Sequence, residues 1–335
     1  MAKKLGIVAL FLGAFLLVLA AMSKFYMYDR VAVVPYNHTA TTIAMTAPGD
    51  DATYLDAAAG LEITTGPLKN TKVVTGDVKA SEKASKDLDR DVAVWDIYDC
   101  TDTPDFDCGS GETALSAVQD RVAFDRHTGE AVTYEDTYSD AGERIEPGDF
   151  EGLYFKFPFD TKKKTYQFWD GTLHQATPAK YVGEGKVKGL KVYKFEQVIE
   201  PVKIDTLDVP GSLVDSDEPT VSADQIYSSV SKYSVEPATG VVIVGQTAQD
   251  NYLEVDGVRK TTTTDATLTY VDQTVTDTVD EFKSKATLLK AAQTWIPIGG
   301  AVLGLLLIAL GLWLRVSSRE DESDTADDDE LVGTR

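Results

Sequence analysis

Two uninterrupted apolar runs lie near the two ends of this chain, and a long polar stretch separates them. The first run covers residues 5–22 and the second covers residues 295–314, and neither contains a charged side chain. A helix needs about 20 mainly apolar residues to cross the hydrocarbon core of a bilayer. The pattern therefore predicts one transmembrane helix at each terminus, with a globular domain held between them.

Basic residues beside these runs predict the direction in which the chain crosses the membrane. Lys3 and Lys4 precede the first run, and Arg315 and Arg319 follow the second. Positive residues beside a span favour the cytoplasmic side. We therefore expect residues 1–4 and the C-terminal tail in the cytoplasm, and the domain between the spans outside it.

The first apolar run has a second interpretation, as a cleavable signal peptide. Val18 and Ala20 have the small-residue spacing that precedes signal-peptide cleavage. The run is long for a signal sequence, however, so we expect a retained signal-anchor at residues 5–22.

The C-terminal segment, residues 315–335, is rich in acidic residues and contains no aromatic residue. Blocks of like charge repel one another and cannot bury enough apolar surface to fold. We therefore expect a disordered cytoplasmic tail.

Residues 23–272 carry the signals of a β-rich domain, because short β-branched and aromatic runs alternate with Gly, Pro and Asp turns. The period then changes to that of a helix, since Val275, Val279 and Phe282 share one apolar stripe. An amphipathic juxtamembrane helix is expected at residues 273–294. The predicted fold class is mainly β (α+β), an extracytoplasmic domain flanked by one transmembrane helix at each terminus.

Two segments of this domain share one pattern. RVAFDRHTGEAV at residues 121–132 and KYSVEPATGVVI at residues 232–243 both predict a strand, an acidic residue, Thr-Gly and a second strand. Gly129 and Gly240 hold equivalent places, where glycine supplies the positive φ that a tight turn needs. The similarity indicates either a duplicated half-domain or two similar hairpins.

The densest aromatic stretch, residues 150–169, is the candidate ligand site. From Leu153 to Phe159 every second residue is apolar, which predicts one face of a strand. This pattern is typical of a core hairpin, and the functional alternative is the wall of an apolar cavity. The candidate ligand-binding side chains are Phe155, Phe157, Phe159 and Trp169.

Three consecutive lysines, Lys162, Lys163 and Lys164, lie at the turn of this predicted hairpin. They form a local basic group on a chain that is otherwise strongly acidic. Such a group is a candidate for contact with anionic lipid headgroups.

Cys100 and Cys108 are the two cysteines of the chain. A nearby pair in an extracytoplasmic, Pro- and Asp-rich loop predicts a local disulfide. The acidic residues of the loop would suit calcium, but their spacing does not match the EF-hand pattern. Calcium remains an alternative to a solvated loop, and we assign no metal ligand.

The composition excludes some classes of function. The net charge of −22, from 54 acidic and 32 basic residues, argues against nucleic acid as a partner. The three histidines are scattered, and the metalloprotease, nucleophile-elbow and P-loop motifs do not occur. We expect no enzyme, no catalytic residue and no cofactor.

Two segments between the terminal spans resemble the actinobacterial "porin PorA" family, long catalogued as a domain of unknown function. They are DRVAFDRHTGEAV at residues 120–132 and GLYFKFPFDTKKKTYQFWDGTL at residues 152–173. The family name implies a pore. A transmembrane barrel needs strands of about ten residues, whereas these strands are short and interrupted, so a pore would require oligomerised helices.

The sequence thus favours a two-pass protein of the cell membrane, with both termini cytoplasmic, whose exterior domain binds or conveys lipid or another apolar ligand. A pore-forming protein and a structural or protein-binding ectodomain are the alternatives. The expected partners are membrane lipid and further copies of the chain, paired through the terminal helices.

Overall fold

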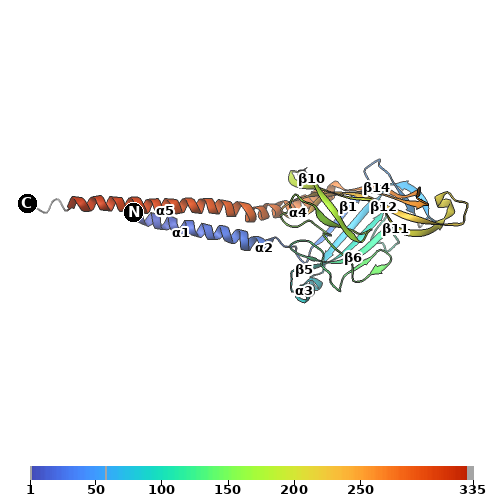
Figure 1. The fold of residues 1–335 in the computed structure, drawn as a ribbon, viewed down its shortest axis with the longest axis horizontal. Coiled ribbons are helices and arrows are strands. Elements are labelled where there is room, and N and C mark those ends of the chain that lie inside the picture. Colours follow the sequence, from blue (N-terminus) through green and yellow to red (C-terminus); the bar gives the residue numbers. More distant parts are fainter. Residues whose placement is uncertain (1, 57–58, 330–335) are drawn as a thin grey trace, which may run out of the picture. The chain divides into compact units, whose positions relative to one another are not determined.

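The computed structural model describes residues 2–56 and 59–329 (Figure 1). The chain divides into two compact units. The helical unit contains residues 1–32 and 285–335, and the β unit contains residues 33–284.

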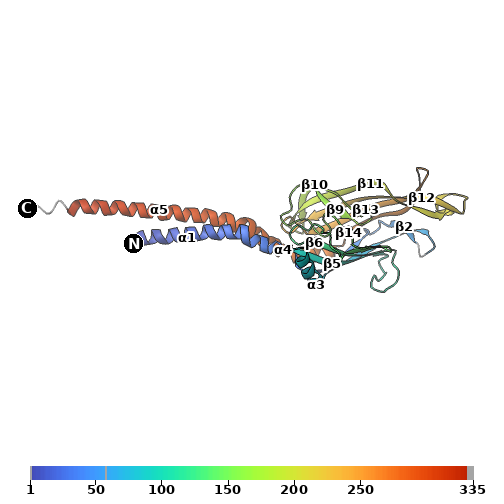
Figure 2. The same ribbon diagram turned by 60° about the horizontal axis from the view of Figure 1, so that its bottom comes forward.

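Two long apolar helices form most of the helical unit, and they lie side by side in Figure 1 and Figure 2. Within the described part of the chain, two helical segments are long and apolar enough to cross a membrane. The elements of this unit are α1 (Ala2–Met22), η1 (Ser23–Met27), α2 (Tyr28–Val31), η3 (Ala291–Trp295) and α5 (Ile296–Asp329).

Glycines form the contact between α1 and α5. A Cβ atom added at Gly13 would lie 2.7 Å from the carbonyl oxygen of Gly304. One added at Gly311 would lie 2.7 Å from the carbonyl oxygen of Gly6. The two contacts run in opposite order along the two helices, so the pair is antiparallel. Small residues of this kind let helix backbones approach closely, as in membrane helix pairs.

Large apolar side chains of the same helices lie on the outside of the pair. Phe11 is 75% exposed and Phe15 is 61% exposed on α1, and Leu306 (62%) and Trp313 (64%) are their counterparts on α5. A helix pair that is stable in water buries its large apolar residues and exposes polar ones. This unit has the reverse arrangement.

Helix α5 is longer than the apolar run predicts. It continues to Asp329, so the segment that we expected to be disordered from residue 315 is helical as far as that residue. The sequence contains no Gly or Pro between Leu312 and Val332 that would end a helix. The last residues of the tail lie outside the described part of the chain.

The β unit contains, among its described residues, a sheet of 14 strands in which paired strands run antiparallel. The strands are β1 (Thr39–Met45), β2 (Ala52–Asp56), β3 (Glu62–Gly66), β4 (Lys69–Gly76), β5 (Val92–Asp102), β6 (Ser116–Asp125), β7 (Tyr138–Asp140), β8 (Arg144–Ile145), β9 (Tyr166–Asp170), β10 (Gln175–Val187), β11 (Leu190–Pro210), β12 (Thr220–Val235), β13 (Val242–Val255) and β14 (Val258–Tyr270). The helices are α3 (Val78–Asp87), η2 (Gly211–Val214) and α4 (Asp272–Lys290), which begins in this unit.

The strand order is β8-β7-β6-β5-β4-β1-β14-β13-β12-β11-β10-β9, and β2 and β3 branch from β14. Most neighbours in this order are consecutive in sequence, as in a chain of hairpins. The exception is β1, which lies between β4 and β14 and so joins the first part of the sheet to the last. The mainly β class that the sequence predicts is confirmed.

Isolated bridges connect the two sides of this sheet. Phe124 of β6 pairs with Ala131. Glu130 pairs with Leu153, which also pairs with Phe168 of β9. These pairings complete a circuit of backbone neighbours from β6 to β9, so the sheet closes on itself there. Closure removes exposed strand edges at that place.

Aromatic side chains fill the interior of the closed sheet. The first aromatic cluster contains Val34, Val74, Ala93, Trp95, Ile97, Val122, Phe124, Phe150 and Trp169. The second aromatic cluster contains Leu153, Phe157, Tyr166, Phe168, Ala179, Phe195 and Val235. Residues 150–159 contribute to both clusters, so this segment lies between the two halves of the sheet.

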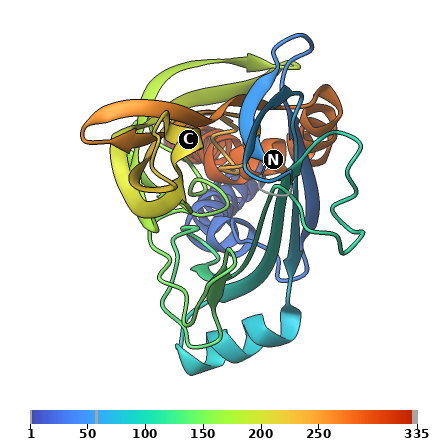
Figure 3. The same cartoon turned by 90° about the vertical axis from the view of Figure 1, so that its right-hand side faces the viewer.

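Two helices cover parts of the outer face of the sheet. Ala80 and Ala84 of α3 pack on β5 and β6 (Figure 3, cyan helix). Val275 and Val279 of α4 pack against Ile243 and the start of β11. The two valines belong to the apolar stripe that the sequence indicates.

Candidate functional site

The segment that we expected to form an aromatic strand is irregular. Between Leu153 and Phe159 only Leu153 makes β-bridges, one to Glu130 and one to Phe168. Pro158 has no N–H to donate to a strand ladder. The N–H of Phe157 donates to the carbonyl of Gly240, over 2.8 Å, instead of to a neighbouring strand of a hairpin. The prediction of a strand at this place is therefore wrong.

The rings of this segment point into two clusters and do not share one face. Phe157 is fully buried and stacks on Phe195, with ring centroids 4.4 Å apart. Phe155 packs in the first aromatic cluster, 5.0 Å from Trp95, and Phe159 packs against the same cluster. Alternation along the sequence does not become one face because the backbone is not extended.

Trp169 also lies in the first aromatic cluster. It is buried, and its ring centroid is 5.3 Å from that of Phe150. Rings in mutual contact fill the space that an apolar ligand would need. This packing removes the basis for a lipid-binding cavity walled by the four predicted aromatic side chains.

Two turns of the same construction lie beside this segment. Gly129 N donates to Asp125 O, and Gly240 N donates to Glu236 O, both over 2.8 Å. The carboxylates of Asp125 and Glu236 each accept the N–H of the threonine before the glycine, also over 2.8 Å. The similarity that the sequence indicates is thus a local structural repeat.

In both turns the glycine lies in close contact with the irregular segment. A Cβ atom added at Gly129 would lie 3.2 Å from the carbonyl oxygen of Lys156. One added at Gly240 would lie 1.9 Å from the carbonyl oxygen of Phe157. Consecutive residues of the segment are therefore held by the two equivalent turns, which fixes its path through the interior.

Lys156 is a buried cation that the sequence analysis missed. The residue is 7% exposed, and its ammonium nitrogen has no hydrogen-bond partner among the described residues. The nitrogen lies 3.8 Å from the ring centroid of Phe159, in a cation–π contact. Burial lowers the pKa of Lys156 to about 7. The predicted strand would have placed this residue on its polar face, so no sequence signal marked it.

The three lysines of the predicted turn remain near the surface. Lys162 pairs with Asp160 at 2.5 Å, and Lys163 pairs with Glu184 at 3.0 Å. Lys164 lies over the ring of Tyr166. Two of the three charges therefore have an acidic neighbour in the domain itself. Contact of these lysines with lipid headgroups stays a prediction.

The predicted disulfide between Cys100 and Cys108 is confirmed. The ammonium of Lys69 reaches into the same loop, where it donates to the carbonyl oxygens of Pro104 (2.5 Å) and Phe106 (3.1 Å). Within the described ranges, no three acidic, histidine or cysteine side chains converge as a metal site requires. The loop's carbonyl oxygens thus already have a cation of the protein as their neighbour.

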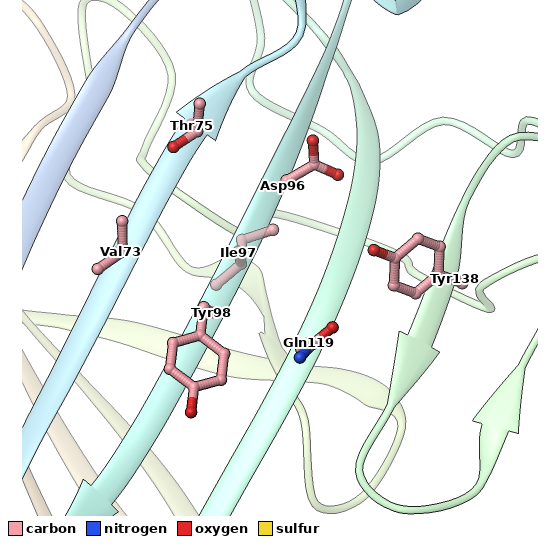
Figure 4. A pocket seen from close by; sticks show the side chains of 7 residues that line it. All are labelled: Val73, Thr75, Asp96, Ile97, Tyr98, Gln119 and Tyr138. Carbon is pink, nitrogen blue, oxygen red and sulfur yellow. The ribbon is translucent and has the colours of Figure 1, made fainter. Parts of the chain in front are cut away.

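An open hollow of about 300 Å³ lies on the outer face of β4 to β7 (Figure 4). The strand register explains its composition, because residues opposite one another on paired strands share a face. Two rows of paired residues cross the strands there. One row is Thr75, Asp96, Arg121 and Tyr138, and the other is Val73, Tyr98 and Gln119. The lining residues of these rows are Val73, Thr75, Asp96, Tyr98, Gln119 and Tyr138, and Ile97 of the first aromatic cluster borders the hollow between Asp96 and Tyr98.

Arg121 stands between Asp96 and Tyr138 in one of these rows. It donates two hydrogen bonds to Asp96, over 2.7 and 2.8 Å, and pairs with Asp77 (2.9 Å) and Asp136 (3.3 Å). Burial opposes its charge, but the hydrogen bonds to Asp77 and Asp96 raise the pKa of Arg121 above its ordinary value. We call these four residues the Arg121 network.

These features define a class of protein: a closed, largely antiparallel β domain with two apolar helices near the termini. A model of the porin PorA family matches residues 5–313. The chain belongs to the porin PorA family, which confirms the resemblance that the sequence indicates.

Two curated proteins with the same family name are similar to this chain. It is 26% identical over 274 residues to "Porin PorA" of Corynebacterium resistens, which covers 71% of this chain and 64% of that protein. It is 24% identical over 300 residues to "Porin PorA" of Corynebacterium amycolatum, which covers 73% of this chain and 76% of that protein. The match thus spans less than two thirds of the length of the Corynebacterium resistens protein.

Proposed function

We propose that this protein is a two-pass membrane protein, with its two apolar helices in the cell membrane as an antiparallel pair. The observation that carries this proposal is the arrangement of side chains in the helical unit. Glycines lie between the helices, and Phe11, Phe15, Leu306 and Trp313 lie outside. Exposing apolar surface to water costs roughly 25 cal/mol per Å². Lipid removes that cost, so membrane lipid is the partner of these helices.

We place the β domain outside the cytoplasm. The disulfide between Cys100 and Cys108 lies in this domain, and disulfides persist in oxidising compartments. Lys4 and Arg315 lie beside the outer ends of the apolar runs, where basic residues favour the cytoplasm. The disulfide and the flanking basic residues independently support the same orientation.

The contact between the helices also supports a retained first helix. Gly6 and Gly13 of α1 fit against Gly311 and Gly304 of α5. Cleavage near Ala20 would remove both of the α1 glycines and leave the glycine face of α5 without its neighbour.

Cysteine labelling tests this topology. A membrane-impermeant maleimide added to spheroplasts is expected to label Ser222→Cys, which replaces an exposed residue of β12, before permeabilisation. Ser318→Cys is expected to react only after permeabilisation. The wild-type protein is the control and is expected to stay unlabelled, because both of its cysteines are in the disulfide. Early labelling of Ser318→Cys, or a mature protein that lacks residues 1–20, would contradict the proposal.

Pore formation is the second candidate, and the name of the family favours it. The described residues of a single copy contain no evident path for a pore. Residues 5–22 and 296–314 contain no polar side chain that could line water. The interior of the closed sheet holds the two aromatic clusters. We therefore propose that any conducting path is built by several copies of the chain.

Planar-bilayer recordings test this second candidate. The purified full-length chain is expected to give stepwise conductance whose frequency rises more steeply than linearly with protein concentration, because several copies must assemble. Heat-unfolded protein is the control and is expected to give no steps. Absence of conductance at any concentration would remove the pore hypothesis, and a linear concentration dependence would contradict the multi-copy path.

A further inference from the structure

Four polar side-chain ends gather in the hollow on β4 to β7 without a partner inside the protein. The hydroxyls of Thr75, Tyr98 and Tyr138 and the amide of Gln119 line it. In the part of the chain that the structure describes, none of these four groups makes a hydrogen bond to another residue. In Figure 4 the hydroxyl of Tyr138 points toward β6, on the side where Gln119 lies. A bound molecule would therefore meet four available hydrogen-bonding groups.

The charges around the hollow disfavour an anionic ligand. Arg121 is the cation of its network, and three carboxylates already surround it. Its side chain is 14% exposed, so it has little surface to offer to a ligand. A second cation, Arg144, lies 3.7 Å from the ring centroid of Tyr138 and already pairs with Glu146 (3.0 Å). A phosphate or carboxylate would therefore meet Asp96 beside cations that carboxylates already neutralise, which is unfavourable.

The same network also leaves the hollow without an unpaired negative charge that would attract a cationic ligand. Both carboxylate oxygens of Asp96, the acidic residue that lines the hollow, accept hydrogen bonds from Arg121. Its charge is compensated inside the protein. The groups that remain for a ligand are neutral hydroxyls and an amide, each of which can both donate and accept. Neutral hydroxyl groups on a ligand match this set.

Two tyrosine rings supply the apolar part of the same surface. Tyr98 and Tyr138 line the hollow from β5 and β7, and each combines an apolar ring with a polar tip. The guanidinium of Arg144 covers one face of the Tyr138 ring, so Tyr138 offers a ligand its hydroxyl and the rest of the ring. The hollow crosses four neighbouring strands, which at about 4.8 Å per strand gives a platform roughly 14 Å wide. Its volume of about 300 Å³ is at the lower end of the range for small-molecule sites.

We propose that this hollow binds a neutral saccharide, with one or two sugar rings lying against Tyr98 and Tyr138 and their hydroxyls bonded to Thr75 and Gln119. The Arg121 network holds β5 and β6 to Asp77 beside α3, so the site exists before the ligand arrives. Preorganisation of this kind lowers the entropic cost of binding. The inference does not depend on the proposed membrane topology or on pore formation.

A glycan array tests the proposal with the full-length protein in detergent. The array carries neutral hexose and pentose oligosaccharides, amino sugars with a free ammonium group, and uronic acids. We expect binding to neutral glycans only. The affinity for the best neutral glycan is expected to be unchanged between low and high salt, because no charge takes part in binding.

Two pairs of variants locate the binding. Gln119→Ala and Tyr98→Ala are each expected to weaken binding of the best neutral glycan about tenfold, because each removes a hydrogen-bonding group of the site. Gln175→Ala on β10 and Tyr252→Ala on β13 are the matched controls outside the hollow, and both are expected to bind like wild type. Thermal unfolding of all four variants checks that each one is folded.

Three outcomes would overturn the proposal. The first is that no glycan binds to the wild-type protein. The second is that the bound glycans are the amino sugars and that salt weakens them, which would identify a cation site beside Asp96. The third is that folded Gln119→Ala and Tyr98→Ala proteins retain wild-type affinity.

Discussion

Replacement of Gly240 by alanine is expected to destabilise the β domain by about 4 kcal/mol or more, which is an exceptional effect for one methyl group. The φ angle of Gly240 is 74°, and a left-handed conformation costs a residue with a side chain roughly 1–2 kcal/mol. The larger part comes from contact, because the new Cβ atom would lie 1.9 Å from the carbonyl oxygen of Phe157. The backbone must move, and the hydrogen bond from Phe157 N to Gly240 O would break.

Variants at two other glycines distinguish the effect of the steric contact on stability from the effect of the backbone strain. Gly257 has a φ angle of 75°, and a Cβ atom there would meet nothing within 4 Å. Gly129 has a φ angle of 80° and an intermediate contact of 3.2 Å. Gly257→Ala is therefore expected to cost only about 1–2 kcal/mol. Gly129→Ala should fall between the other two variants.

The measurement is denaturant unfolding of the full-length protein in detergent, followed by the circular dichroism of the β domain. The expected order of destabilisation is Gly240→Ala, then Gly129→Ala, then Gly257→Ala. Equal losses at the three positions would show that strain alone decides the effect. In that case the two turns would not hold residues 156 and 157 in place.

The sequence predicted the apolar helices and the two turns because their signals are local. A run such as residues 5–22 needs only length and composition to identify it. The Thr-Gly turns need only an acidic residue, a threonine and a glycine at fixed spacing. In both cases the residues that decide the structure are neighbours in the chain.

The aromatic segment failed as a prediction because its structure is decided by distant residues. The alternation from Leu153 to Phe159 is a sound local signal for a strand. Its rings are instead divided between Phe195 of β11 and Trp95 of β5, which belong to the two halves of the closed sheet. Packing between two cores outweighs local propensity here, as tertiary context does for β structure in general.

The hollow on the outer face could be predicted only in part. Asp96 and Tyr98 are two residues apart in β5, and residues at this spacing share a face in any strand, so their common face could be inferred from the sequence. Gln119 and Tyr138 join them only through the register of β6 and β7. Register depends on which strands pair, and a single sequence does not state that pairing.

Replacement of Lys156 by methionine is expected to stabilise the protein at neutral pH and to remove part of its pH dependence. The pKa of Lys156 is lowered to about 7 by burial, whereas an unfolded lysine titrates near pH 10.4. Between these values the unfolded chain binds the proton and the folded protein does not. The free energy of unfolding therefore rises as the pH increases from about 7 to about 10. Below about pH 7 the ammonium is charged in both states, so the cost of burying it is fully present.

Lys156→Met removes this cost and shortens the unbranched side chain by one atom only, so that most of its packing beside Phe159 is retained. The gain at pH 7 is on the order of 4 kcal/mol, since each unit of pKa shift corresponds to about 1.4 kcal/mol. It should shrink to less than about 1 kcal/mol near pH 10 and vanish only above about pH 11, where the wild-type lysine is neutral in both states. Lys164→Met, at an exposed lysine of the same segment, is the matched control and should change stability by less than about 0.5 kcal/mol.

Denaturant unfolding of wild type and both variants at several values between pH 6 and pH 10 measures this difference. The quantity of interest is the difference between wild type and Lys156→Met at each pH, because other titrating groups, tyrosines included, cancel in it. A difference that does not change with pH would mean that Lys156 keeps its proton in the folded protein. A loss of stability in Lys156→Met at pH 7 would mean that the cation–π contact with Phe159 outweighs the cost of burial.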